Sequence, residues 1–173
     1  VIGICGGFQM LGEAIHDPQA IESAAGSSQG LGLLQFETTL AGNKTLRNVK
    51  GVSLTTGAQV CGYEIHAGVS TGIALASPLL SLSFQNDDGS FADSKFNDGA
   101  ISTDGKIIGT YVHGAFDEKA MLAEILTWAG LTKLADFDYK AYRENEINRL
   151  ADVVEKELPI TVLKKLLSLS AVS

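Results

Sequence analysis

The chain has 173 residues, 45% of them hydrophobic, which is enough for one domain with a sizeable core. Its formal net charge of −7 at pH 7 argues against nucleic acid or an anionic membrane surface as a partner. The sequence contains no apolar run long enough to span a membrane, no signal-peptide pattern and too few cysteines for a disulfide framework, which together predict a cytoplasmic protein with reduced thiols.

Residues 1–9 form the first strongly patterned segment, in which an apolar run leads to Cys5 and two glycines. Apolar residues follow at the spacing of a helix, at Phe8, Leu11 and Ile15. This order predicts a strand, a sharp turn and a helix, with Cys5 at the turn, where a helix N-terminus favours a thiolate. Gly6 and Gly7 would let backbone N–H groups approach the group that the sulfur attacks. The pattern is typical of a nucleophile elbow built on cysteine; a buried structural cysteine is the alternative.

The middle of the chain predicts short strands joined by polar loops. Residues 33–38 and 63–66 have strand-like patterns. Residues 43–57 are polar and predict a loop with a short strand, and residues 85–98, dense in Asn, Asp, Gly and Ser, predict a mobile loop. Cys61, next to a glycine, is expected to be a small buried residue.

Residues 105–112 are rich in β-branched and aromatic side chains and predict a strand that delivers His113. The Asp104-Gly105 pair before it predicts a two-residue hairpin. Asp117 is predicted to cap a helix whose apolar face is formed by Met121, Ile125 and Trp128. A histidine at a strand end can serve as general base for a thiol nucleophile. Alone, His113 would be an ordinary structural histidine; together with the cysteine elbow it predicts a catalytic pair.

The C-terminal part of the chain predicts two helices. The first has an apolar face formed by Ile147, Leu150, Val154 and Leu158. Pro159 is expected to end it and to open a second helix. Strand–helix alternation followed by helices predicts an α/β fold, an open mixed or parallel sheet flanked by helices with a helical C-terminal tail. The expected domains are residues 1–131 and a helical extension over residues 132–173, whose apolar face would pack on its own domain or on another.

Several motifs then point to a family. The Gly3-x-Cys5-x-Gly7-x-Gln9 motif resembles the nucleophile motif of class I (triad-type) glutamine amidotransferases, which have a flavodoxin-like fold. Six stretches, in the same order along the chain, are similar to those of the cobyric acid synthase family: residues 6–12, 17–18, 21–23, 30–34, 62–66 and 109–114. The resemblance extends from the start of the chain to about Leu131 and continues more weakly into the tail.

The resemblance implies that Cys5 attacks the side-chain amide of glutamine while His113 transfers the proton, and that the Gly6 N–H stabilises the oxyanion. Gln9 and Glu64 are predicted to bind substrate, although a solvent-facing Gln9 is an open alternative. Position 115 is alanine where many class I glutaminases have the third triad residue, so Glu64 is the first candidate to orient His113 and Asp117 the second. Two further histidines complete the set: His66 could contact substrate, and His16 is predicted at the end of the first helix.

The resemblance also implies a partner, an N-terminal ATP-dependent synthetase domain that binds ATP and Mg. No phosphate-binding loop and no metal-site spacing occur in this sequence, so no cofactor or metal is predicted here. The amidotransferase domain is interpreted as N-terminally truncated, without the loop that supplies a second oxyanion-hole amide, and is therefore expected to be nearly inactive alone. Ammonia would serve the amidation of a corrinoid, adenosylcobyrinic acid a,c-diamide, in cobalamin biosynthesis.

Alternative functions stay open from the sequence. Within the same chemistry, the chain could be the glutaminase of cobyrinic acid a,c-diamide synthase or of cell-wall lipid II amidation. A cysteine peptidase or related hydrolase would act on peptides in place of free glutamine. A non-catalytic docking domain that kept the fold is the remaining alternative, and the presence of both Cys5 and His113 argues against it.

Overall fold

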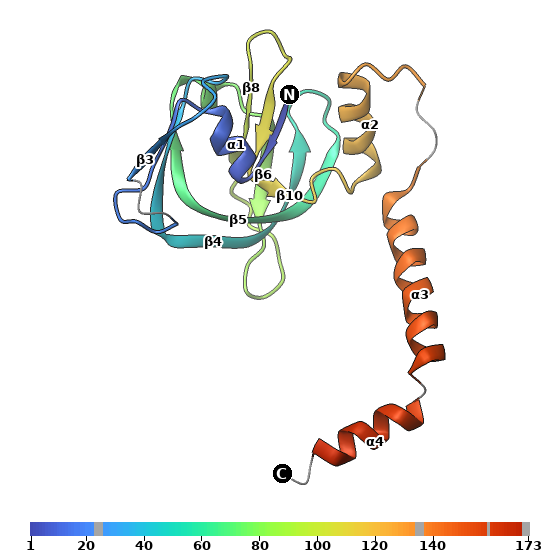
Figure 1. Ribbon diagram of the computed structural model, residues 1–173. Coiled ribbons are helices and arrows are strands. Elements are labelled where there is room, and N and C mark those ends of the chain that lie inside the picture. The colour runs from blue at the N-terminus through green and yellow to red at the C-terminus, as the bar shows by residue number, and fades with distance from the viewer. Residues whose placement is uncertain (23–25, 134–136, 159, 171–173) are drawn as a thin grey trace. The chain divides into compact units, whose positions relative to one another are not determined.

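The computed structural model describes residues 1–22, 26–133, 137–158 and 160–170 and divides the chain into two units, Val1–Leu134 and Ala135–Ser173 (Figure 1). The first unit contains all of the strands described below. Its sheets combine parallel and antiparallel pairs and are flanked by helices, which confirms the predicted α/β class.

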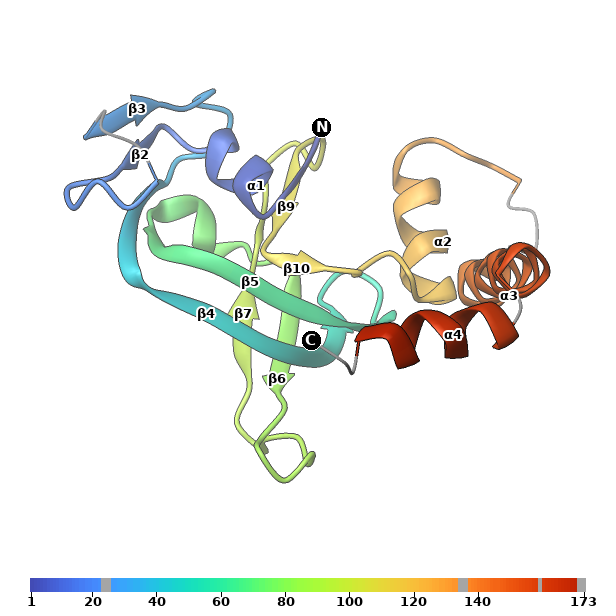
Figure 2. The same cartoon turned by 60° about the horizontal axis from the view of Figure 1, so that its bottom comes forward.

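A small sheet near the N-terminus has the order β1-β9-β8. Strand β1 (Ile2–Ile4) pairs in parallel with β9 (Ile108–Thr110), and β9 pairs antiparallel with β8 (Ala100–Ile101). Helix α1 (Gly6–Leu11) starts directly after β1 and lies beside these strands in both views (Figures 1 and 2). This order of strand, turn and helix is the one that the first residues predict.

A larger sheet is built around two long curved strands, β4 (Glu37–Ser53) and β5 (Gln59–Thr71), which pair antiparallel (Figure 2). β5 also pairs with β10 (Val112–His113), and β4 with β2 (Ala14–His16), which in turn pairs with β3 (Ser27–Gln29). Strands β6 (Leu80–Phe84) and β7 (Phe96–Asp98) extend the sheet from β4. A short 3-10 helix, η1 (Ile73–Ala76), follows β5.

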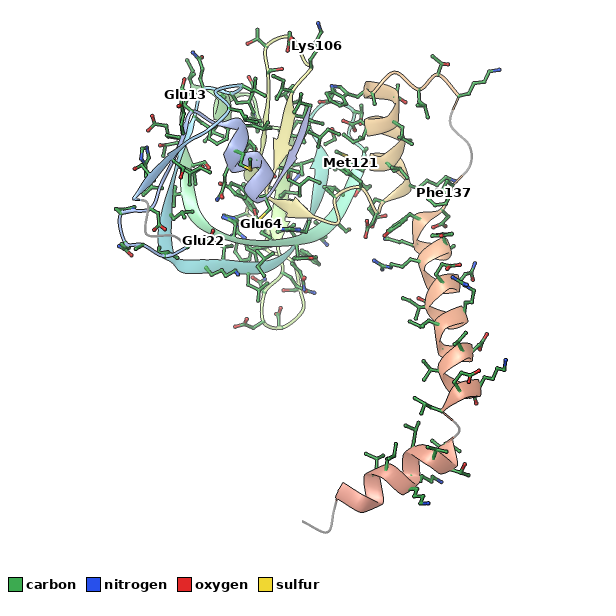
Figure 3. The ribbon with its side chains drawn as sticks, viewed as in Figure 1. Glu13, Glu22, Glu64, Lys106, Met121 and Phe137 are labelled. Atoms are coloured by element: carbon green, nitrogen blue, oxygen red, sulfur yellow. The ribbon has the colours of Figure 1, made fainter. Side chains whose placement is uncertain are left out.

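Two apolar clusters form the core of the first unit. One lies between the larger sheet and α2 (Lys119–Trp128), and it includes Met121, which is fully buried on the side of α2 that faces the strands (Figure 3). Ile125 is buried in the same cluster and Trp128 packs against it, so the predicted apolar face of this helix is confirmed. The second cluster surrounds α1 and contains Phe8, Leu11, Leu34, Phe36, Ala100 and Tyr111.

The first helix is shorter than its apolar spacing predicts. It ends at Leu11, and residues 14–16 form β2, so Ile15 and His16 belong to a strand. Gly12 explains the ending: its backbone is extended, and a Cβ there would lie 2.6 Å from the carbonyl oxygen of Phe36. The backbone at Gly12 therefore lies directly against Phe36, the residue before β4. A further helical turn that carried side chains would not fit there.

Two predictions about strands in the middle of the chain are only partly right. Of residues 33–38, only Glu37 and Thr38 belong to a strand, because β4 begins at Glu37. The segment 43–57, expected to be mainly a loop, instead supplies most of β4 up to Ser53. Its inward positions include the polar residues Thr45 and Arg47, so the alternation of apolar and polar side chains that marks a half-buried strand is hidden.

Other local predictions need smaller corrections. Residues 85–98, expected to be one mobile loop, contain β7 at their end. Cys61 is exposed, because strand alternation turns its neighbour Val60 into the core. The N-cap of α2 is Glu118, not Asp117, whose backbone N–H closes a turn on the Gly114 carbonyl. The predicted hairpin between β8 and β9 is confirmed, but its loop spans residues 102–107 and is longer than two residues.

The second unit contains α3 (Tyr139–Glu157) and α4 (Ile160–Ser170), as the C-terminal pattern predicts. The Asp138 carboxylate caps α3 by accepting the backbone N–H of Ala141 at 3.0 Å. The predicted helix break at Pro159 lies outside the described residues. No helix in the described part of the chain is both long and apolar enough to cross a membrane.

Candidate active site

Cys5 lies at a strained turn between β1 and α1. Its backbone adopts φ 54° and ψ −114°, a conformation that is costly for any residue with a side chain. Its N–H donates to the Thr110 carbonyl at 2.9 Å, and its carbonyl accepts the first helical bond from Gln9. Open space lies beside Gly6 and Gly7, because a Cβ added to either would meet no atom within 4 Å. The turn therefore presents the thiol next to backbone N–H groups and unfilled space, as a nucleophile elbow does.

Cys5 and α1 contact one edge of β5. Strand β10 pairs with this edge at Tyr63 and Glu64. Beyond the paired residues, two backbone carbonyls of β5 accept hydrogen bonds from the side chains of Cys5 and Gln9. The Cys5 thiol donates to the Ile65 carbonyl at 3.4 Å, and the Gln9 side-chain amide donates to the Ala67 carbonyl at 3.2 Å. Gln9 is 8% exposed, so the solvent-facing alternative for this residue is wrong.

His113 reaches the same edge of β5 from β10. Its ring stacks on Tyr63 with 5.1 Å between centroids and an angle of 9° between the planes. Its Nε2 atom is buried and has no hydrogen-bond partner within the described residues. Cys5 contacts β5 at Ile65 and His113 contacts it at Tyr63, so the structure brings the predicted pair to neighbouring positions of one strand. A buried ring nitrogen without a partner is available for a thiol or a substrate.

Glu64 does not orient His113 in this structure. Its carboxylate is buried and accepts from the Arg47 guanidinium at 2.5 Å (Figure 3 labels Glu64). Glu64 pairs with Val112 across β5 and β10, whereas His113 pairs with Tyr63. Because successive residues of a strand point to opposite faces, Glu64 and His113 lie on opposite faces of the sheet.

Asp117, the other candidate for the third position, lies closer to the histidine along the chain. Its Oδ2 atom is 3.6 Å from where a Cβ of Gly114 would lie, and Gly114 follows His113 directly. The turn that its N–H closes on Gly114 keeps the carboxylate at this end of β10. Asp117 is therefore placed near the backbone of the histidine strand, and the stacking on Tyr63 holds the ring itself.

A polar cavity of about 290 Å³ lies on the inner face of β5. Its lining includes Arg47, Glu64, His66, Asp98 and Tyr111. The Arg47 guanidinium lies over the Phe96 ring at 4.2 Å and near the Phe84 ring at 5.5 Å, which fixes its position. Neither Cys5 nor His113 lines this cavity; Glu64 and His66, the neighbours of Ile65 on β5, connect it to the strand segment that the Cys5 thiol contacts. Arg47, Tyr111 and Asp98 were not among the residues predicted from the sequence.

His66 presents a second buried and unpartnered nitrogen, Nδ1, among the described residues. Its ring stacks on Tyr111 with 3.9 Å between centroids. Burial lowers the pKa of His66 below its ordinary value, with the neighbouring Glu64 charge opposing the shift. At neutral pH the imidazole is therefore uncharged and can offer a hydrogen-bond acceptor to the cavity.

Asp98 is a buried carboxylate at the end of β7. It accepts the Thr110 hydroxyl and the Tyr111 N–H, the latter at 3.3 Å. Burial raises the pKa of Asp98 to about 6 in spite of these hydrogen bonds. The sequence carries no signal that separates Asp98 from the three other aspartates of residues 85–98.

A larger, apolar cavity of about 620 Å³ lies between α2 and the sheets. Leu79, Ile108 and Trp128 line it, and neither Cys5 nor His113 belongs to it. Its polar wall is the Glu124 carboxylate, which accepts from Ser53 and Thr56. No residue that lines it belongs to the β5 segment that Cys5 and His113 contact, so this cavity is separate from the candidate active site.

Comparison with known families identifies the class of domain to which the chain is similar. In the described part of the chain no group of three His, Cys, Asp or Glu side chains is arranged to hold a metal ion. A family model described as CobB/CobQ-like glutamine amidotransferase domain matches residues 1–121. The matched range contains the elbow, the edge of β5 and His113.

Proposed function

The chain belongs to the CobB/CobQ-like glutamine amidotransferase family, and from this premise we propose that it hydrolyses glutamine at Cys5 to supply ammonia. The observation that carries the proposal is the pairing at the β5 edge. A cysteine in a strained elbow and a histidine with a buried, unpartnered Nε2 contact the same short stretch of β5.

The proposed reaction has two halves. His113 accepts the proton of the Cys5 thiol while the sulfur attacks the side-chain carbonyl carbon of glutamine. The same imidazole returns the proton to the departing nitrogen, so that ammonia leaves and a glutamyl thioester remains. Water then attacks the thioester with His113 as base, which releases glutamate and restores the thiol. The Gly6 N–H, which follows the sulfur-bearing residue directly at the start of α1, is assigned to the oxyanion, a donor whose loss typically costs about 3–4 kcal/mol.

Substrate recognition is assigned to Gln9 and Glu64. The Gln9 amide is held by the Ala67 carbonyl one helical turn past the sulfur, so its oxygen can meet the substrate side chain. Glutamine also carries an ammonium and a carboxylate group. The Glu64–Arg47 pair lines the cavity on the opposite face of β5 from His113 with one charge of each sign, and the head group is assigned to it across the edge of the strand.

The ammonia acceptor is the finer part of the proposal. The motifs that resemble the cobyric acid synthase family support a partner synthetase domain that binds ATP and Mg and amidates a corrinoid, adenosylcobyrinic acid a,c-diamide, in the cytoplasm. The matched family includes both CobB-like and CobQ-like domains, so the match supports the glutaminase chemistry and leaves the diamide synthase as the alternative acceptor reaction. Lipid II amidation and a docking role stay as further alternatives.

A glutaminase assay tests the proposed chemistry. Glutamate release is measured in the presence of the synthetase partner, ATP and corrinoid diamide. We expect Cys5→Ala to abolish release and Cys61→Ala, which removes the exposed cysteine on β5, to leave it unchanged. Release that survives Cys5→Ala would overturn the role of Cys5, and hydrolysis of peptides in place of glutamine would support the peptidase alternative.

A second arm tests the acceptor. Cys5→Ala protein is offered either glutamine or ammonium, and amidation of the corrinoid is followed by mass. We expect loss of glutamine-dependent amidation together with retention of the ammonium-dependent reaction. If wild-type protein releases glutamate but leaves this corrinoid unchanged with either donor, the glutaminase assignment stands and the cobyric acid synthase assignment fails.

A further inference from the structure

The chain changes sheets just before His113. Strand β9 ends at Thr110 in the small sheet, and β10 begins at Val112 in the larger sheet. Tyr111 belongs to neither strand, so the backbone N–H groups at the crossing need partners outside a regular ladder. The crossing also determines how the two proposed catalytic residues lie relative to each other. Cys5 follows β1 of the small sheet, whereas His113 belongs to β10 of the larger sheet.

Two buried side chains supply those partners. The Tyr111 N–H donates to Asp98 Oδ1 at 3.3 Å, and the Val112 N–H donates to the Thr110 hydroxyl at 3.0 Å. The Thr110 hydroxyl in turn donates to Asp98 Oδ2. Asp98 and Thr110 are 6% and 1% exposed, so water does not compete for these bonds. Each N–H at the crossing is therefore fixed by one of these two side chains.

Thr110 is also tied to the nucleophile. Its backbone carbonyl accepts the Cys5 N–H at 2.9 Å, while its hydroxyl holds the first residue of the histidine strand. Asp98 is anchored independently, because its own carbonyl accepts the Leu79 N–H at 3.0 Å and β7 pairs with β6. One threonine thus connects the cysteine turn to the histidine strand, and one carboxylate fixes that threonine to the larger sheet.

We propose that Asp98 and Thr110 are positioning residues that set the His113 imidazole relative to the Cys5 thiol by locking the crossing from β9 to β10. The inference rests on the proposed glutaminase function for its kinetic consequence only. Without the hydroxyl the Val112 N–H loses its acceptor, and β10 can shift along β5. A displacement of about 1 Å between reacting groups can cost about 10²-fold in rate.

Thr110→Val tests the proposal, because valine keeps the shape and removes the hydroxyl. The protein carries Cys61→Ala so that Cys5 is the only cysteine that reacts. Three quantities are measured with the synthetase partner present: kcat and KM for glutamate release, the rate of Cys5 alkylation by iodoacetamide across pH 5–9, and the melting temperature. Thr110→Ser, which restores a hydroxyl, is the rescue variant, and Thr127→Val on the exposed side of α2 is the matched control.

We expect Thr110→Val to lower kcat about 10²-fold, to change KM little and to alter the pH profile of Cys5 alkylation, with Thr110→Ser close to wild type. A lower melting temperature with an unchanged kcat and alkylation profile would show a merely structural role and overturn the proposal. If Thr110→Val does not fold, the same three measurements on Asp98→Asn decide. The asparagine side-chain N–H would donate to the Thr110 hydroxyl, which in the wild type donates to Asp98. If wild-type protein releases no glutamate, the proposed function fails, and the alkylation profile alone then supports or overturns the positioning role.

Discussion

Replacing Arg47 by methionine would isolate a buried charge. The Glu64 side chain is 3% exposed, and the Arg47 guanidinium lies 2.5 Å from its carboxylate. Methionine keeps most of the apolar stem that packs near Phe84 and Phe96 and removes the positive charge. The variant therefore leaves the Glu64 carboxylate inside the sheet without its cation, while the packing of the neighbouring rings is largely kept.

The magnitude follows from burial. Removing one partner of a fully buried ion pair typically costs about 3–5 kcal/mol. The Arg47 side chain is 35% exposed, so water can replace part of the lost interaction, and we expect a loss of about 2–3 kcal/mol in the free energy of unfolding. For a chain of this size that corresponds to a fall of about 5–10 °C in melting temperature.

Urea unfolding of four proteins checks this expectation: wild type, Arg47→Met, Glu64→Gln and the double variant. The double variant should recover most of the loss, because neither charge remains buried. Lys50→Met on the exposed face of the same strand is the control; it removes a cation that lies 4.0 Å from the Phe91 ring and should cost no more than about 1 kcal/mol. If Arg47→Met is no more destabilising than Lys50→Met, the buried pair does not stabilise the fold and the reasoning is refuted.

Three further predictions concern the active site and its support. Gly62→Ala should lower glutaminase kcat about 10²-fold, because its Cβ would lie 2.2 Å from the His113 carbonyl, whereas Gly42→Ala should be silent; equal kinetics would contradict this. The pKa of Asp98 is raised to about 6 in the folded protein, so the carboxyl group binds its proton more tightly there than in the unfolded chain. The contribution of Asp98 to the free energy of unfolding should therefore fall by about 1.4 kcal/mol per pH unit as the pH rises from about 4 to 6. Asp98→Asn should flatten this dependence in urea titrations, and an unchanged slope would show that Asp98 does not cause it. Gln9→Leu should raise KM for glutamine about tenfold without slowing alkylation of Cys5, and a fall in kcat alone would assign Gln9 another role.

The sequence was sufficient for the parts of the site that depend on local pattern. An apolar run, a cysteine and two glycines predict the elbow, and the strained φ of Cys5 agrees with it, while Gly6 and Gly7 are helical and leave open space beside them. A β-branched run before His113 likewise predicts that a strand delivers it, although the single predicted strand over residues 105–112 is divided between β9 and β10, which belong to different sheets. Neither inference needs knowledge of distant residues.

The remaining features depend on contacts between distant segments. The length of α1 is set by the close approach of Gly12 to Phe36, which no helical spacing reveals. The polar inner face of β4 hides its period because Arg47 is satisfied there by Glu64 from another strand. Assigning Glu64 to His113 failed for a related reason: pairing register decides which face a side chain occupies, and the register is a tertiary property.

The most direct test of the account is to locate the nucleophile chemically. Protein assembled with its synthetase partner is treated with a glutamine analogue that carries a diazoketone in place of the side-chain amide, and the modified residue is found by mass spectrometry. The account predicts one adduct, on Cys5 and not on Cys61, which forms more slowly when His113 is replaced by glutamine. An adduct on Cys61, or an unlabelled Cys5 in protein that still hydrolyses glutamine, would contradict it.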